Sequence, residues 1–363
     1  MRNPLIPYAL ICLGLPLAAQ TAPEPPPQEP VYFTEPEQPW WIPKGHLILT
    51  AERIPAVGDP MAPGVDRLRA HLELGWKTTW GVAVGEVAFR AGLGSDGNTF
   101  NSSRYDQEPS NGVWLKRASV AFPVARERVF GELTLGLQSN PLLSQESLWD
   151  HDLALVGAGL RAAFRREEAG IQEAGIRAVK GRVRTFPDAD VDLTAVQGVV
   201  RFEVGNWIWT GHAGRWELAW EAGAHRNRSA LRSNGAGLQR MRLDAVGMGL
   251  QATGSWPWEL KAIQHRNPAT GESGKEAQVW LGSRARVWRP QTGYIWQQYA
   301  FTGTLMPVNG DEWWFTRAAW GPRYMLVLPL PHRCRLTLSH MKQRWDGAEG
   351  TVERTALTLL WQF

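Results

Sequence analysis

The feature that most constrains this fold is the alternation of apolar and polar residues from about His46 to the C-terminus. Segments of roughly 10 to 14 residues alternate in this way, and turn residues separate them. In the last segment, one face carries Leu357, Leu359, Trp361 and Phe363, and the other carries Arg354, Ala356, Thr358 and Gln362. Because successive side chains of a strand point to opposite faces, a period of two predicts β-strands.

We expect about sixteen strands, with about fourteen or eighteen as alternatives. They are predicted over residues 45–54, 66–78, 81–93, 112–123, 128–138, 152–165, 172–185, 190–204, 211–226, 239–252, 256–266, 276–289, 291–305, 313–328, 332–344 and 351–363.

The connections between these strands alternate in length. Short ones are expected at 78–81, 123–127, 166–170, 253–255, 290 and 329–331, and longer ones at 55–65, 94–111, 138–151, 226–239, 265–276 and 346–350. The connection at 187–190 is short where a long one is expected. Outer-membrane barrels have tight periplasmic turns and long external loops. The alternation therefore predicts an even number of strands with both chain termini in the periplasm. In a soluble β-sandwich nothing would require short and long connections to alternate.

Tryptophan is unusually abundant, with 20 in the chain. Six lie at or beside proposed short turns: Trp80, Trp207, Trp209, Trp256, Trp258 and Trp288. Four lie near proposed long loops: Trp149, Trp220, Trp313 and Trp314. An indole has an apolar body and one N–H donor, so it favours the headgroup region of a membrane. We expect two aromatic girdles.

A closed sheet explains why such strands would cross a membrane. In lipid each unpaired backbone group costs several kcal/mol, and a closed barrel leaves no unpaired edge. At about sixteen strands the interior is too wide for side chains to fill and should hold water. The expected fold class is therefore all-β, a transmembrane antiparallel up-and-down β-barrel.

The N-terminal residues have the pattern of a signal peptide. Arg2 supplies a positive charge, residues 5–17 are apolar, and Leu17-Ala18-Ala19 suits a signal peptidase. We expect a signal peptide over 1–19, a proline-rich periplasmic arm over 20–44 and the barrel over 45–363. Cys12 would then be removed, which leaves Cys334 as the one thiol and no internal disulfide.

Two stretches resemble known bacterial proteins. The end of the chain, with Leu359, Trp361 and Phe363, resembles the terminal strand of outer-membrane proteins, which implies recognition by the barrel-assembly machinery. The second stretch reads Leu133-Thr-Leu-Gly-Leu-Gln-Ser-Asn-Pro-Leu142 and leads into Leu148-Trp-Asp-His-Asp-Leu-Ala-Leu-Val-Gly-Ala-Gly-Leu160. Together with the preceding strand 113–122, it resembles the bacterial outer-membrane porin family. That resemblance covers residues 113–160 only. It implies a porin fold and passive diffusion, and no catalytic residue.

Other chemistry has weaker support in the sequence. Asp150, His151 and Asp152 could bind a divalent cation, but turn hydrogen bonds explain the two aspartates more simply. The histidines are scattered and no Gly-x-Ser-x-Gly elbow occurs near them. We therefore expect no enzyme, cofactor or metal. A membrane-embedded lipid or lipopolysaccharide hydrolase and a secreted soluble β-sandwich stay as alternatives.

The expected function is passive diffusion of small polar solutes or ions across the outer membrane. The formal net charge is +4 and the pI is near 9.2. The arginines alternate along strands instead of forming runs, so we expect no nucleic-acid partner and a weak preference for anions. The expected partners are outer-membrane lipid and lipopolysaccharide, the assembly machinery and small solutes, and a homo-oligomer is left open. The predicted pore-lining residues are Arg67, Arg69, Glu73, Arg182, Arg184, Arg240, Arg242, Asp244, Arg284, Arg286, Arg333, Arg335 and Arg354.

Overall fold

The computed structural model describes residues 43–55, 65–95, 111–145, 147–149, 153–183, 191–220, 240–282, 287–300, 303, 318–345 and 351–363. Several predictions lie outside these ranges: the signal peptide, most of the proline-rich arm, the cluster from Asp150 to Asp152, Trp313 and Trp314, and the proposed pore-lining residues Arg184, Arg284 and Arg286.

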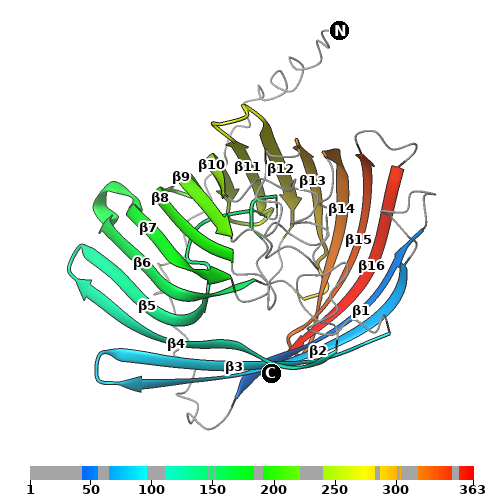
Figure 1. Cartoon of the computed structure of the whole chain (residues 1–363), viewed down its shortest axis with the longest axis horizontal. Helices are drawn as coiled ribbons and strands as arrows, with labels where there is room; N and C mark the ends of the chain where they lie inside the picture. Colours follow the sequence, from blue (N-terminus) through cyan, green and yellow to red (C-terminus); the bar gives the residue numbers. More distant parts are fainter. Residues whose placement is uncertain are drawn as a thin grey trace, which may run out of the picture. The chain divides into compact units, whose positions relative to one another are not determined.

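Sixteen antiparallel strands close into one barrel, which confirms the predicted fold class (Figure 1). Each strand pairs with its neighbours in the chain, and β1 pairs with β16 to complete the ring. The strands are β1 Lys44–Ile54, β2 Val65–Trp80, β3 Ala83–Gly94, β4 Gly112–Arg126, β5 Val129–Ser139, β6 Ala154–Arg166, β7 Ile171–Val183, β8 Val191–Val204, β9 Trp207–Trp220, β10 Arg240–Ala252, β11 Trp258–Arg266, β12 Ser273–Leu281, β13 Gln291–Tyr299, β14 Ala319–Leu330, β15 Cys334–Trp345 and β16 Thr351–Gln362. The short 3-10 helix η1, Glu167–Ala169, joins β6 to β7.

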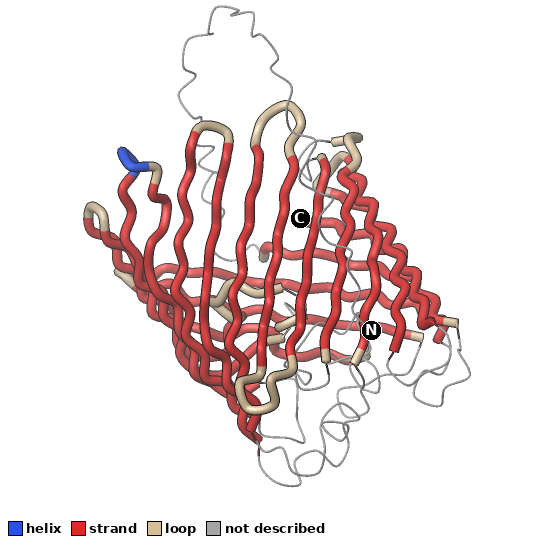
Figure 2. The backbone as a smooth tube through the Cα atoms, turned by 90° about the horizontal axis from the view of Figure 1, so that it is seen from above, coloured by secondary structure: helices blue, strands red, loops and turns tan. Residues whose placement is uncertain are grey.

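Most short connections lie together at one end of the strands. We call the end with connections 81–82, 127–128, 167–170, 205–206, 253–257, 282–290 and 331–333 the turn end, and the opposite end the loop end. The short connection expected at residue 290 is wrong, since β12 ends at Leu281 and β13 begins at Gln291. In Figure 2 the blue turn of η1 and neighbouring tan turns share one edge of the barrel. Among the described residues, no helix is both long and apolar enough to cross a membrane.

The largest error in the predicted strand limits is at β12, which was expected to end at residue 289 and ends at Leu281. The start of β9 was also misplaced, since it was expected at residue 211 and lies at Trp207. Gly205 and Asn206 make the whole turn, and Gly205 has a φ of +57°. Glycine adopts this left-handed conformation readily, which permits a tight hairpin turn. Trp207 and Trp209 therefore belong to the strand itself.

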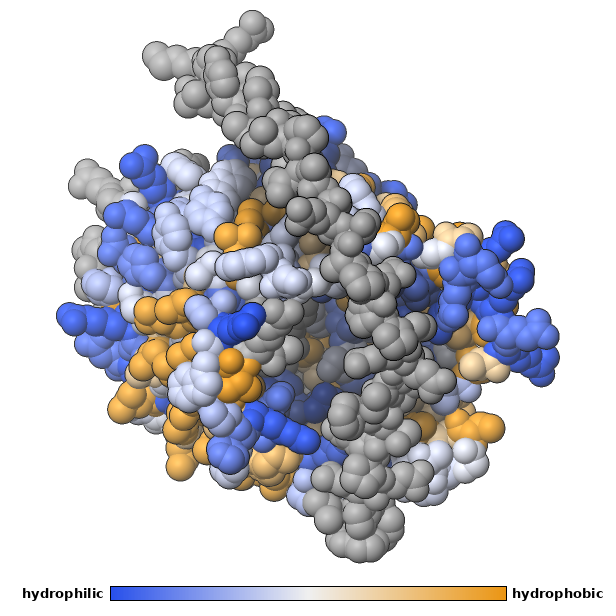
Figure 3. Space-filling view, turned by 180° about the vertical axis from the view of Figure 1, so that it is seen from behind, coloured by the Kyte–Doolittle hydropathy of each residue, from blue (hydrophilic) through white to orange (hydrophobic). Residues whose placement is uncertain are grey.

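The two faces of the barrel differ in polarity over most strands. The outer face carries many exposed large apolar side chains, among them Leu68, Val87, Val200, Met248 and Leu326. In the space-filling view, apolar residues (orange) reach the outer edge of the barrel on both sides (Figure 3). The opposite face carries buried charged and amide side chains, which a closed barrel encloses. This arrangement suits lipid outside and water inside.

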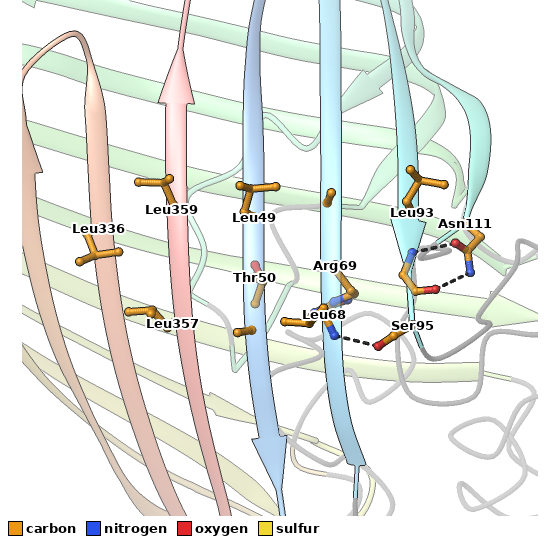
Figure 4. A pocket seen from close by; sticks show the side chains of 13 residues that line it. Leu49, Thr50, Leu68, Arg69, Leu93, Ser95, Asn111, Leu336, Leu357 and Leu359 are labelled. Carbon is orange, nitrogen blue, oxygen red and sulfur yellow. Dashed lines mark hydrogen bonds between the residues drawn. The ribbon is translucent and has the colours of Figure 1, made fainter.

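A leucine-lined groove marks the outer face where the barrel closes (Figure 4). Leu359 of β16 lies opposite Leu49 of β1 on one side and Leu336 of β15 on the other. Thr358 and Thr337 pair on the inner face, and the Thr358 hydroxyl is 3.3 Å from the Thr50 hydroxyl. The predicted faces of the terminal strands thus agree with the register.

An arginine introduced on the outer face of β15 should destabilise the barrel more than one introduced on the inner face. Leu336→Arg should lower the free energy of unfolding by at most roughly 2–4 kcal/mol, the cost of an arginine that faces lipid at the midplane of the membrane. Thr337→Arg is the matched control, since its side chain faces the interior and should cost little. Reversible refolding of both variants in lipid vesicles measures the difference. Equal costs would mean that the faces are exchanged.

Candidate channel interior

The segment that joins β5 to β6 enters the barrel, and its described residues appear as the teal trace inside the ring (Figure 1). We call its described residues, 140–145 and 147–149, the inward segment. Polar side chains of the wall hold it. Arg177 donates to the Pro141 carbonyl at 3.0 Å, and the Gln197 amide bonds both the N–H and the carbonyl of Leu143 at 2.8 Å each. The Ser147 N–H donates to Glu276 Oε2 at 2.9 Å. The segment is thereby attached to β7, β8 and β12.

Apolar contacts attach the same segment. Leu148 and Trp149 are 0% and 1% exposed, and the Trp149 ring lies 6.3 Å from the Trp216 ring of β9. With Leu142 of the same segment and Leu153, they form one buried cluster with the inner face of β6–β11. Its members in these strands are Leu155, Val179, Val183, Val191, Leu193, Ala195, Trp216, Leu218, Met241, Leu243, Ala245 and Ile263. Trp149 was expected in an aromatic girdle, and this is wrong, since it packs inside the barrel.

Four of the predicted pore-lining residues face outward: Arg182, Arg240, Arg242 and Asp244. They alternate with buried residues such as Met241 and Leu243, which pack against the cluster under the inward segment. The prediction failed because it assumed that the polar face of each strand lines the interior. Near the loop end of β7–β10 the polarity is reversed, since the inward segment covers an apolar inner wall.

Ion pairs occupy this reversed outer surface. Arg215 donates to Asp244 at 2.8 Å, Arg240 lies 3.0 Å from Glu217, and Arg182 lies 3.2 Å from Asp192. Closer to the turn end, the same strands present Val200, Phe202, Trp209 and Met248 outward. The change from charged to apolar side chains marks where lipid contact would begin.

Five predicted residues do face the interior: Arg67, Arg69, Glu73, Arg335 and Arg354. Arg333 lies instead in the turn between β14 and β15, with a positive φ of 57°. Leu359 and Trp361 face outward, and Phe363 follows β16, where its N–H and carbonyl both pair with Gly45 at 3.0 and 3.1 Å.

Glu52 is the centre of a buried ion cluster that the sequence did not indicate. Its side chain is fully buried and accepts a bond from Arg67 Nε at 2.6 Å. Arg354 of β16 contacts the same carboxylate, and Arg69 Nη2 lies 3.5 Å from it. Glu52 therefore joins β1, β2 and β16 across the closure of the barrel.

Two further carboxylates form similar clusters on the inner wall. Glu73 accepts from Arg90 at 2.8 Å and also contacts Arg117, which lies 3.0 Å from Glu86. Glu173 pairs with Arg161 at 2.7 Å and with Arg177 at 3.0 Å, and Arg177 also holds the inward segment. Alternation places these residues on polar faces, but their pairing depends on neighbouring strands.

A cavity of about 520 Å³ lies between the inward segment and the wall of β8–β14. One transverse row of directly paired residues crosses it: Arg201, Thr210, Gly249, Lys261, Gln278, Ile295 and Arg323. Leu143, Ser144 and Gln145 of the inward segment line the other side. Sequence analysis missed Arg201, Lys261 and Arg323, although each lies in a predicted strand.

A serine and a histidine do meet inside the barrel, which bears on the enzyme alternative. Ser147 Oγ is 3.4 Å from His265 Nε2, and His265 Nδ1 bonds the Gly303 carbonyl. Both residues are buried, at 1% and 0% exposure, so this pair presents no surface to a substrate. Within the described ranges, no group of three or more acidic, histidine or cysteine side chains could hold a metal ion.

Comparison with solved structures identifies the fold. Pseudomonas putida OprB at high pH is similar with a TM-score of 0.58 and 10% identity, over 88% of this chain and 94% of that one. Salmonella typhi OmpF, in complex with daunomycin, is similar with a TM-score of 0.53 and 12% identity, over 88% of this chain and 97% of that one. No family model matches the sequence, and comparison with curated proteins gives no match. The fold of this chain is that of the bacterial outer-membrane porins, as the resemblance in the sequence implied.

Proposed function

We propose that the protein is an outer-membrane channel for passive diffusion of small polar solutes or ions. The observation that carries this proposal is a closed sixteen-stranded barrel whose interior holds ionised side chains and one segment that narrows it. Polar and charged side chains on the inner wall are typical of a membrane barrel whose interior holds water. The leucine-rich outer face supports insertion in a membrane.

The turn end is proposed to face the periplasm, with both chain termini there. Exposed indoles gather at that end of the barrel: Trp80, Trp207, Trp256, Trp288 and Trp361. Such residues are enriched at the interface between lipid and water. Short periplasmic turns and longer external loops are the rule in bacterial outer-membrane barrels.

A weak anion preference is proposed on the charges that face the interior. The described basic residues on the inner face include Lys44, Arg67, Arg69, Lys77, Arg90, Arg117, Arg161, Arg177, Arg201, Lys261, Arg323, Arg335 and Arg354. The described acidic ones are Glu52, Glu73, Glu86, Glu132, Glu173, Glu203, Glu259 and Glu276. The basic residues outnumber the acidic ones, so a narrow interior should concentrate anions.

Current through the channel should therefore carry a small excess of chloride. In a planar bilayer with a potassium chloride gradient, the reversal potential should have the sign of anion selectivity at low salt. It should shrink towards 1 M salt, where the Debye length is about 3 Å. A cation-selective reversal potential would contradict the preference, and absence of any conductance would contradict the channel itself.

Phe363 is proposed as part of an assembly signal for the barrel. Phe363→Ala keeps the backbone pairs with Gly45 but removes the aromatic ring, so the folded barrel should lose only about 1–3 kcal/mol of burial. Surface levels in cells should fall several-fold if the ring is recognised during insertion. Gln362→Ala is the control at the neighbouring position. Equal surface levels of the Phe363→Ala variant and the unmodified protein would contradict the signal.

A further inference from the structure

A groove on the outer face of β5–β9 combines an apolar floor with a row of polar side chains. Its volume is about 390 Å³, which falls within the usual range of small-molecule sites. We infer that it binds one membrane lipid with a phosphomonoester headgroup, whose acyl chain lies on the apolar floor. The inference rests on the membrane location in the proposed function and is independent of conduction through the interior.

The part of the groove nearer the turn end is apolar. Leu160 of β6, Ala178 of β7 and Val196 of β8 lie directly opposite one another on one transverse row. Leu160 and Val196 are 39% and 50% exposed, and the single methyl group of Ala178 leaves a depression between them. Towards the turn end, Gly198 of β8 pairs with Ala213 of β9, so the side chains there are small as well. An acyl chain that fills this depression gains apolar contact along its length.

The next row towards the loop end is polar. Lys180 of β7 lies opposite Thr194 of β8, and both side chains are exposed and line the groove. Arg215 of β9 lines it from the other side. The Arg215 guanidinium has five N–H donors, and its Nε bonds Asp244 at 2.8 Å. An ammonium, a hydroxyl and a guanidinium beside an apolar depression suit the three acceptor oxygens of a phosphomonoester.

The outer surface at the loop end of β7–β10 carries more cations than carboxylates. Each of its three described carboxylates has an arginine partner in the ion pairs given above. Lys180, in contrast, forms no ion pair with a carboxylate of the described residues. The described cations are Lys180, Arg182, Arg215, Arg240 and Arg242, and the described carboxylates are Asp192, Glu217 and Asp244. An anionic headgroup complements this excess of positive charge, and a neutral partner does not.

The position of the groove favours a lipid over a second copy of the chain. The groove lies where the outer face changes from apolar to charged side chains, and at that depth of a membrane acyl chains meet their headgroups. A lipid bound there contacts the apolar row with its chain and the polar row with its headgroup.

Native mass spectrometry of the full chain in detergent tests the site. Dioleoyl phosphatidic acid carries a phosphomonoester, and dioleoyl phosphatidylcholine has the same chains with a zwitterionic headgroup. The first phosphatidic acid should bind at least about tenfold more tightly than the first phosphatidylcholine, because hydrogen bonds between charged partners are the stronger ones. Inorganic phosphate at the same concentration should not displace it, since free phosphate has no chain to bury.

Two variants separate the headgroup contacts from the chain contacts. Lys180→Gln should weaken binding of phosphatidic acid about five- to tenfold, because one charge-assisted contact is lost. Ala178→Phe should weaken binding of both lipids about fivefold or more, because the ring fills the depression and leaves the charges unchanged. Lys342→Gln is the matched control. This lysine is on the outer face of β15, is 52% exposed and lies 2.9 Å from Glu353, and the variant should bind as the unmodified protein does.

Equal binding of the two lipids would overturn the inference, and so would full affinity for phosphatidic acid in both the Lys180→Gln and Ala178→Phe variants. A dimer that Ala178→Phe disrupts would assign the groove to a second copy and would also overturn it. Conductance of the same preparations is measured in a planar bilayer. A barrel that binds the lipid but does not conduct keeps this site and loses the proposed function. One that conducts without a preference for phosphatidic acid loses the site and keeps the function.

Discussion

Glu52→Gln is expected to lower the free energy of unfolding by roughly 3–5 kcal/mol, the usual cost of removing one partner from a buried ion pair. Glutamine has the same shape but no charge. Arg67 and Arg354, whose side chains are 2% and 9% exposed, would then both lose the buried carboxylate that they share. Because the cluster joins β1, β2 and β16, the loss should appear in the global unfolding of the barrel in lipid vesicles.

Asp244→Asn is the matched control for this experiment. It also removes a carboxylate from an arginine, but Arg215 and Asp244 are 52% and 44% exposed. Exposed pairs contribute roughly 0–1 kcal/mol. Similar losses for the Glu52→Gln and Asp244→Asn variants would show that burial of the Glu52 cluster does not decide its contribution.

Leu148→Asp should release the inward segment and raise the single-channel conductance on the order of twofold, since a sixteen-stranded barrel without a constriction leaves a wide aqueous channel. Leu148 is fully buried between the segment and the inner wall. A carboxylate there would lie among the apolar side chains of this cluster, and burying a charge in such surroundings is strongly unfavourable. The segment can leave the wall while the strand ladder keeps its hydrogen bonds.

Leu360→Asp makes the same chemical change on the inner face of β16, opposite Arg335 and away from the inward segment. Its conductance should stay close to that of the unmodified channel. An unchanged conductance in the Leu148→Asp variant, with the protein still inserted, would mean that the segment does not limit the current.

The local sequence pattern was sufficient to predict the barrel. The period of two, the glycine and proline turns and the indoles near turns predicted sixteen strands, and the pairs Leu359–Leu336 and Thr358–Thr337 have the expected faces. The error at β9 arose at a turn of only Gly205 and Asn206. These features are set by residues close together in the chain, because strand geometry and turn conformation depend on neighbouring residues.

The interior could not be predicted in the same way. Alternation divides each strand into two faces, but it does not say which face is enclosed. For β2 and β15 the polar face is inside, as predicted for Arg67 and Arg335. For β10 the polar face is outside, because the inward segment lies against Met241 and Leu243.

The sequence by itself thus determined the strands, their order and the existence of two faces, since these follow from backbone periodicity and turn chemistry. Only the tertiary structure decided that the inward segment enters the barrel and that Glu52 meets Arg354 some three hundred residues along the chain. It also placed Arg201, Lys261 and Arg323 on one row. The physical reason is that ring closure brings distant strands together, and the register between them sets which side chains meet.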